Sequence, residues 1–306
     1  MSMQAGQGVE NTRYGLRYVD DKMSRSRYLI IWHFAILPAL YRASRRGMLT
    51  MKRDPIYYQN CKDVLSRSSL FAGLPETLLD SMLSLFRRDT WRRGVNLAPV
   101  IFQERFYLLI EGRLEVTRIN PQTGRSITLS ILGPGDGIDM VTLLNTQPHE
   151  VVPVALDDVS LISVPIDAAR DWIGRHPEFN RNFLPYLGEQ MRRMEDLATD
   201  LALHDTMTRL ARLILRHVAP QHPQSVDGKF HLRLIHDLHD EALARMVGSV
   251  RQVVNRHLQH WRKQGVLHRH KFHTEVAELE SLKEYAGEAS LPRLQKKRLS
   301  SMNGTR

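Results

Sequence analysis

Residues 241–264 constrain this chain more than any other stretch, because they have the layout of two helices joined by a tight turn. In the first helix, Leu243 and Met246 fall on one face together with Val247. Gly248 supplies the backbone freedom that a sharp turn needs. Apolar residues then recur at steps of three and four, which predicts a second helix. That second apolar face consists of Val250, Val253, Val254, His257, Leu258 and Trp261.

The remaining surface of the second helix is cationic and rich in amides. Arginine can bond guanine bidentately, and Asn or Gln can bond adenine, so such a helix suits the major groove of DNA. An ordinary solvated helix is the alternative. The residues expected to read bases are Arg251, Gln252, Asn255 and Arg256, and those expected to contact phosphates are Arg262, Lys263, Arg269 and Lys271.

The charge of the chain supports a polyanionic partner. Its 306 residues allow two domains, and 42% hydrophobic with 25% charged residues is typical of a globular protein. The net charge is +10, and residues 206–273 hold 12 Lys or Arg against 4 Asp or Glu, a local excess of +8. Double-stranded DNA is favoured over an acidic membrane because the cations gather around the turn between the helices.

The single cysteine, Cys61, excludes an internal disulfide, a CxxC zinc site and a four-thiolate iron–sulfur cluster. A reducing cytoplasm is the expected location. The sequence has no Gly-rich phosphate loop, nucleophile elbow or metal-spaced carboxylate pair, so we do not expect an enzyme.

Upstream, the pattern becomes β-rich. Residues 70–83 predict a short helix with Pro75 in its first turn. Short β-rich runs follow, separated by Gly- and Pro-containing turns, which is typical of a jelly roll or small barrel. The runs are residues 106–110, 112–118, 126–132 and 159–164.

Residues 182–203 return to a helical period, with an apolar seam of about three heptads that favours a dimer. A helix lying on its own β domain is the alternative. Residues 206–218 predict a further helix, 220–228 a loop, and 266–277 two strands forming a wing. The seam residues are Leu184, Leu187, Met191, Met194, Ala198 and Leu201.

The expected fold is thus α+β, with an N-terminal β-roll, a long dimerisation helix and a C-terminal winged helix-turn-helix. The five segments are an extension at 1–60, the roll at 61–180, the dimerisation helix and hinge at 181–204, the winged domain at 205–288, and a basic disordered tail at 289–306.

The extension contains an apolar run at residues 28–41, which is short of the ~20 residues that span a bilayer. Three interpretations stay open: an accessory helix, a signal peptide, and upstream sequence before a true start at Met48 or Met51. The signal peptide is the least favoured, because the run begins late and ends in a Tyr-Arg pair.

Three motifs in this order resemble the Crp-Fnr superfamily of bacterial transcription regulators: Leu-Phe-Ala-Gly-Leu-Pro at 70–75, Leu-Gly-Pro-Gly-Asp at 132–136 and Leu-Ala-Arg-Met-Val-Gly at 243–248. The resemblance covers residues 65–286. It implies a cyclic-nucleotide-binding-like β-roll, homodimers on palindromic operators, and a hinge near residues 203–205 through which a signal in the roll reorients the DNA-binding domains. RNA polymerase is a further expected partner.

The expected effector pocket departs from that family. Nucleotide-binding members have Gly-Glu and Arg-Ser where this chain has Asp139-Met140 and His149-Glu150. A phosphate would meet Glu150 without an arginine, so cyclic AMP is not expected as the effector. The candidate pocket residues are Met140, His149 and Glu150.

Haem, another small effector or no effector at all remain possible. The candidate axial ligands for haem are Met140, His149 and His176, with His33 in the extension. A haem or small-ligand sensor acting through protein contacts is therefore the alternative function. Zinc at His268, His270 and His273 is less favoured than phosphate contact, so no metal is expected.

The recognition helix departs from the family as well. The frequent Ser-Arg-Glu-Thr-Val start is Val-Arg-Gln-Val-Val here, so Val250 replaces the usual Ser cap and Gln252 replaces a base-reading Glu. Ser249 is a candidate displaced cap. Because glutamine suits adenine whereas glutamate accepts from cytosine, we expect an operator that differs from the family consensus at this position.

Overall fold

The computed structural model describes residues 54–145, 149–219, 229–270 and 273–287. The apolar run at 28–41, the loop at 220–228, the tail at 289–306, His33 and Lys271 lie outside the described residues. No helix in the described part of the chain is long and apolar enough to cross a membrane.

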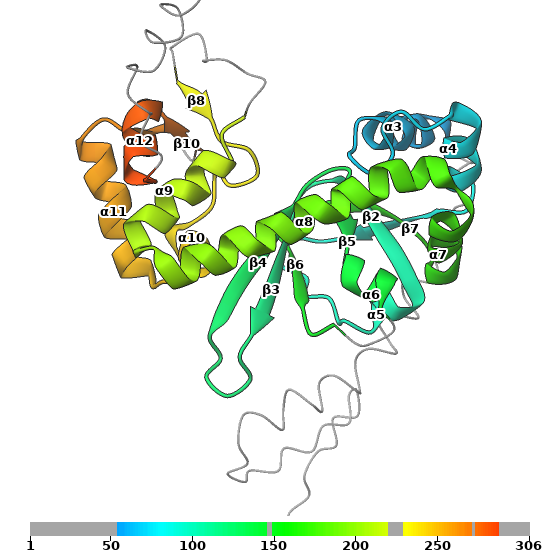
Figure 1. Ribbon diagram of the computed structural model, residues 1–306, viewed down its shortest axis with the longest axis horizontal. Coiled ribbons are helices and arrows are strands. Elements are labelled where there is room, and N and C mark those ends of the chain that lie inside the picture. The colour runs from blue at the N-terminus through cyan, green and yellow to red at the C-terminus, as the bar shows by residue number, and fades with distance from the viewer. Residues whose placement is uncertain (1–53, 146–148, 220–228, 271–272, 288–306) are drawn as a thin grey trace, which may run out of the picture. The chain divides into compact units, whose positions relative to one another are not determined.

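The β-roll consists of two antiparallel sheets (Figure 1). One sheet has the strand order β1-β7-β2-β5, and the other has the order β4-β3-β6. The bounds are Arg87–Trp91 for β1, Arg105–Glu111 for β2, Leu114–Ile119 for β3, Ser126–Leu132 for β4, Gly137–Ile138 for β5, Val152–Ala155 for β6 and Val159–Pro165 for β7. The four strands expected from sequence are present, and β1, β5 and β6 were not predicted.

The sequence of strand β2 is a short, almost continuous run of apolar residues, and its packing explains why. Its side chains alternate between two faces. Phe106, Leu108 and Ile110 pack into a core under the helices, whereas Tyr107 and Leu109 pack into a second core. Because both faces are buried, both sets of side chains must be apolar.

Helices cover the first of these cores. They are α3 (Pro55–Ser66), α4 (Glu76–Leu83), α6 (Met140–Leu144) and α7 (Ile166–Arg175), whereas α5 (Ile101–Glu104) packs Phe102 into the second core.

Helix α3 crosses the boundary that we expected at residue 60, and it buries Tyr57, Cys61 and Leu65 in the roll. Burial raises the pKa of the Cys61 thiol to about 12, so this cysteine is an apolar core residue.

The helix expected at 70–83 was too long at its N-terminal end. It begins at Glu76, after Pro75 as its N-cap, and residues 70–73 form a turn that buries Leu70 and Phe71. The apolar period at Leu70 and Phe71 reflects burial in that turn, which periodicity does not distinguish from helical burial.

Helix α8 (Pro177–Leu203) starts in the core of the roll through Phe179, Phe183 and Tyr186 and then leaves it. Its apolar seam lies on a different face and is largely exposed, with Leu184 at 64% and Met191 at 73% of full exposure. Of the six seam residues, Leu187 alone packs on the core of the roll. The helix ends at Leu203, and His204 and Asp205 separate it from α9.

The C-terminal domain packs four helices against a three-stranded sheet of order β8-β10-β9. Trp261 is its largest fully buried side chain. The bounds are Thr206–Arg216 for α9, Phe230–His231 for β8, Asp240–Met246 for α10, Arg251–Lys263 for α11, Leu267–His270 for β9, His273–Val276 for β10 and Leu279–Tyr285 for α12. The predicted helix-turn-helix and wing strands are present, and β8 is an additional strand.

His217, after α9, should make the stability of this domain depend on pH. Burial lowers the pKa of its imidazole, and nearby Arg216 also lowers it, although Nδ1–H donates to the Leu213 oxygen at 2.9 Å. The unfolded chain therefore takes up the proton first, so stability is full above about pH 6.5 and falls as the solution becomes more acidic.

We expect His217→Gln to lose less stability than the parent protein when denaturant titrations are compared between pH 7.5 and 5. Because all the other titrating groups are common to both proteins, the difference isolates His217. Superimposable pH profiles would show that His217 does not titrate between the folded and unfolded states.

Candidate nucleic-acid interface

Helix α11 turns one face into the domain and the other to solvent. Val254, Leu258 and Trp261 are buried, whereas Val250, which we expected on the buried face, is 54% exposed. Val250 is the N-cap, where the backbone has left the helical path, so helical periodicity does not apply to it.

The displaced cap expected at Ser249 is absent. Val250 caps α11 without a side-chain hydrogen bond, and the Ser249 hydroxyl lies 3.4 Å from that of Thr206. Gly248 has φ +60°, as the tight turn requires, and a Cβ there would lie 2.6 Å from Leu201 Cδ2. The turn is therefore fixed by Gly248 and by the packing of Leu201 against it.

The exposed face of α11 carries most of the expected base readers. Arg251, Gln252 and Arg256 are exposed, as is Lys263 at the C-terminal end. A surface hollow of about 670 Å³ lies along the first turns of the helix. Its lining residues are Val250, Arg251, Gln252 and Asn255.

Asn255 and Arg262 were expected on the exposed face of α11, but both are partly buried. The Asn255 amide Nδ2 donates to a carboxylate oxygen of Asp240, the first residue of α10. Arg262 is half-buried, and its Nε finds no acceptor in the described part of the chain. Burial lowers the pKa of Arg262, whereas nearby Asp240 raises it. Arg262 thus faces α10 as well as solvent.

The wing adds a second exposed surface. His268 and Arg269 are exposed on β9, and the two wing strands pair His273 with His270 and Thr274 with Arg269. Lys271 lies outside the described residues.

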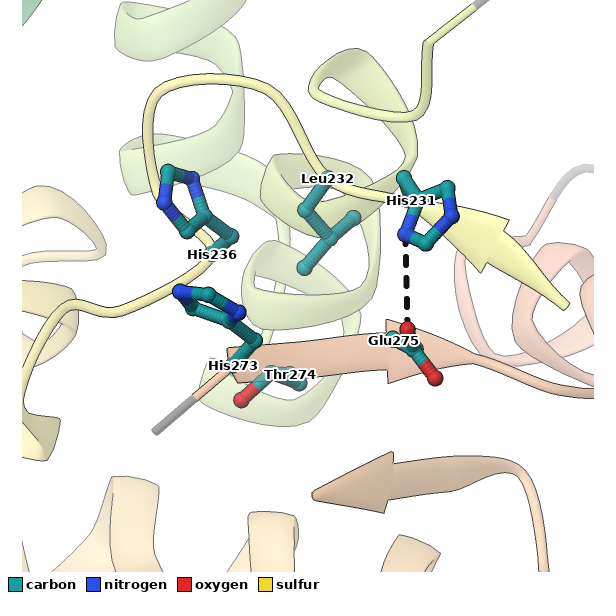
Figure 2. A pocket seen from close by; sticks show the side chains of 6 residues that line it. All are labelled: His231, Leu232, His236, His273, Thr274 and Glu275. Atoms are coloured by element: carbon teal, nitrogen blue, oxygen red, sulfur yellow. Dashed lines mark ion pairs between the residues drawn. The ribbon is translucent and has the colours of Figure 1, made fainter. Parts of the chain in front are cut away.

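A pocket of about 270 Å³ lies beside β10 (Figure 2). The His236 and His273 rings meet edge-on with centroids 4.8 Å apart, while His231 Nδ1 lies 3.4 Å from Glu275 (Figure 2). In the described residues, no three His, Cys, Asp or Glu side chains are placed to share a metal ion. His236 and His273 thus form one pair, and His231 pairs separately with Glu275.

A partly buried ion-pair cluster joins the C-terminal domain to the roll. Arg113, only 9% exposed, donates to both oxygens of Asp157 at 2.7 and 2.8 Å and to both oxygens of Asp237 at 2.6 and 3.0 Å. It also donates to the Leu234 backbone oxygen at 2.7 Å. Hydrogen bonding to Arg113 lowers the pKa of Asp237. Asp157 belongs to the roll and Asp237 to the C-terminal domain, so Arg113 bonds both.

A second ion pair lies nearby. Arg245, on α10, donates to both oxygens of Glu115 on β3, at 3.1 and 2.8 Å. The Glu115 side chain is 3% exposed and accepts from Thr128 at 2.5 Å. Ile131 of β4 packs into the core of the C-terminal domain. The first helix of the helix-turn-helix is therefore bound to the β3–β4 face of the roll.

Leu234 adopts a backbone conformation that is rare for a branched residue. Its φ is +63°, and its side chain lies against Gly133, where a Cβ would approach Leu234 Cδ2 to 2.8 Å. Such a strained backbone persists only where surrounding contacts hold it in place. At Leu234 these contacts are the hydrogen bond from Arg113 and the packing against Gly133. The partners in these contacts are far apart in sequence, so no local pattern could have identified them.

The expected effector pocket contains an internal contact between an imidazole and a carboxylate. His149 Nδ1 lies 2.7 Å from Asp139 Oδ1, and the Asp139 side chain is 1% exposed. Asp139 has φ +55° and accepts from the backbone and hydroxyl of Thr142 at the start of α6. Glu150 is exposed and pairs with Arg118 at 3.4 Å. The basic group at His149 is thus already paired with a carboxylate.

Met140 packs against the first core of the roll, and a Cβ on Gly137 would overlap its terminal methyl group. His176 begins the turn between α7 and α8 and is the N-cap of α8. His149 is hydrogen-bonded to Asp139, the N-cap of α6, whereas His176 lies at the junction of α7 and α8.

Comparison with known proteins matches both domains. Residues 102–176 match the family model described as a cyclic nucleotide-binding domain, and residues 208–285 match that of the Crp-like helix-turn-helix domain. The chain is 27% identical over 208 residues to the CRP-like cAMP-activated global transcriptional regulator of Mycobacterium tuberculosis, covering 66% of this chain and 89% of that protein. It is 29% identical over 206 residues to the global nitrogen regulator of Synechococcus elongatus, covering 63% and 90%.

Solved structures show the same fold. A CooA variant from Carboxydothermus hydrogenoformans aligns with a TM-score of 0.58 at 23% identity, covering 71% of this chain and 93% of that one. FixK2 from Bradyrhizobium japonicum aligns with a TM-score of 0.55 at 18% identity, covering 67% and 99%.

A sensor roll of the cyclic-nucleotide-binding type followed by a Crp-like helix-turn-helix defines a DNA-binding transcription regulator, which is not an enzyme. The chain belongs to the Crp-Fnr family, as its three sequence motifs indicated.

Proposed function

We propose that this protein is a homodimeric, sequence-specific transcription regulator that binds a palindromic operator in the cytoplasm. The observation that carries the proposal is the exposed face of α11, where Arg251, Gln252 and Arg256 stand free beside a surface hollow. Arginine and glutamine there match the hydrogen-bonding groups of guanine and adenine in the major groove. Lys263 and Arg269, both exposed, flank this face and suit phosphates. RNA polymerase is the proposed protein partner.

The sensor is proposed to respond to something other than cyclic AMP. The Mycobacterium tuberculosis relative is described as cAMP-activated, yet here the basic side chain of the pocket, His149, faces the buried carboxylate of Asp139. A cyclic phosphate would have to displace that carboxylate or approach it, and both cost energy. Equilibrium dialysis with cyclic AMP should give no binding at micromolar concentration; saturable binding with one site per chain would contradict this part of the proposal.

The dimer is proposed to form along the seam of α8. A seam with Leu184, Met191 and Met194 exposed is unfavourable in water and becomes favourable when a second copy covers it. Two-fold symmetry then presents two recognition helices to two half-sites.

Met191→Glu should raise the dissociation constant of the dimer by roughly 100-fold or more. Burying one Met side chain contributes about 1.5 kcal/mol or more, and a symmetric interface loses this twice. Sedimentation velocity across a concentration series measures the shift. Arg192→Glu is the matched control, because Arg192 is exposed on the same helix and outside the seam. Equal effects of both variants would place the interface elsewhere.

The proposed function is tested by selection from random duplex pools with the full chain at moderate salt. We expect enrichment of one palindromic site with half-sites one helical turn apart. An unenriched pool, with binding that depends on salt alone, would refute sequence-specific recognition.

A further inference from the structure

We propose that Asp240 is a positioning residue that sets the base preference of Asn255. This inference rests on the proposed function. It concerns residues of two different helices: Asp240 begins α10, and Asn255 lies in α11, with its side chain lining the hollow beside Arg251 and Gln252.

The hydrogen bond between these residues fixes the orientation of the amide. An ionised carboxylate only accepts, so the Asn255 nitrogen must face Asp240 and the amide oxygen must face away. An asparagine without such a partner can turn its amide over and present donor and acceptor in either order. The Asp240 carboxylate therefore selects one of the two orders before DNA arrives.

That orientation keeps the groups needed to read adenine. The amide nitrogen carries two hydrogens, and the bond to Asp240 uses one of them. The second hydrogen can donate to adenine N7 while the oxygen accepts from N6, which is the bidentate pattern for adenine. In the opposite order, the same amide would place its donor against the adenine amino group. Asp240 thus favours adenine by excluding the competing orientation.

The charge of Asp240 is balanced within the domain. Arg262 is half-buried and is attracted by Asp240, so it supplies a neighbouring cation. Without such a cation, a carboxylate beside the groove would repel the DNA backbone.

Three variants on the operator selected by the parent protein test the inference: Asp240→Ala, Asn255→Ala and the double variant. We expect both single variants to lower the preference for adenine about tenfold at the same position of each half-site, and the double variant to lower it no further. Preferences at other positions should stay unchanged. Asp240→Asn keeps an oxygen acceptor and should lie between the parent protein and Asp240→Ala.

Glu241→Ala is the matched control, since it removes the same charge from the adjacent exposed residue of α10. It should leave the adenine preference intact. If Asp240→Ala and Glu241→Ala both change the affinity for all sequences by the same factor, Asp240 acts through its charge alone. That result would overturn the inference. Thermal unfolding of each variant separates loss of the fold from loss of preference.

The failure of this inference differs from failure of the proposed function. If the parent protein enriches no operator, the proposed function fails and this inference fails with it. If the parent protein enriches an operator and Asp240→Ala keeps the adenine preference, only the positioning role is refuted.

Discussion

Replacing Arg245 by methionine should increase hydrogen exchange of β3, β4 and residues 232–239 by roughly 100-fold, which corresponds to about 3 kcal/mol. Arg245 is the cation of Glu115, whose side chain is only 3% exposed. Removing it leaves a buried carboxylate with Thr128 as its remaining partner in the cluster. The loss of stability cannot exceed the free energy that holds the two domains together. Once the domains separate, Glu115 is exposed to water and its burial no longer costs energy.

The matched control restores the charge balance. Glu115→Gln combined with Arg245→Met removes both charges and retains an acceptor for Thr128, so the double variant should recover most of the protection from exchange. The Arg113 cluster is intact in both variants. If the single and double variants exchange equally fast, the contact depends on packing around Ile131, and the ion pair contributes little to holding the domains together.

The second large effect is expected at the recognition helix. Arg256→Ala should cost roughly 1–3 kcal/mol on the preferred operator and relax the preference at one position of each half-site, because an exposed arginine on this face suits bidentate contact with guanine. Fluorescence anisotropy on the operator and on its single-base variants measures both quantities.

Lys263→Ala is the comparison that separates base reading from charge. Lys263 is exposed at the C-terminal end of α11, so its loss should weaken binding to all sequences similarly and reduce the slope of log affinity against log salt by about one. A base-specific loss of affinity in Lys263→Ala would contradict its assignment as a phosphate contact. A uniform loss across sequences in Arg256→Ala would contradict its assignment as a base reader.

The sequence pattern correctly predicted features that depend on residues close together in the chain, such as helix α11 and the turn before it. The step of three and four located α11 because Val254, Leu258 and Trp261 all pack on one core. The turn at Gly248 was predictable because a positive φ is accessible to glycine. Val250 was misplaced because a residue at a helix terminus no longer follows the helical period.

The contacts between elements were not predictable in the same way. Arg113 meets Asp237 and Arg245 meets Glu115 across more than 100 residues, and each residue in isolation resembles an ordinary surface charge. Asp240 likewise resembles a first-turn acid that complements the helix dipole. Only the fold brings it to Asn255, where its carboxylate accepts from the amide nitrogen.

The central claim is that α11 reads a DNA sequence, and the ratio of specific to non-specific affinity tests it most directly. The affinity of the full chain for its selected palindrome should exceed that for a permuted duplex of the same length by about 1,000-fold or more at physiological salt. A ratio near one at every salt concentration would contradict the claim and leave the cationic surface as a non-specific polyanion site.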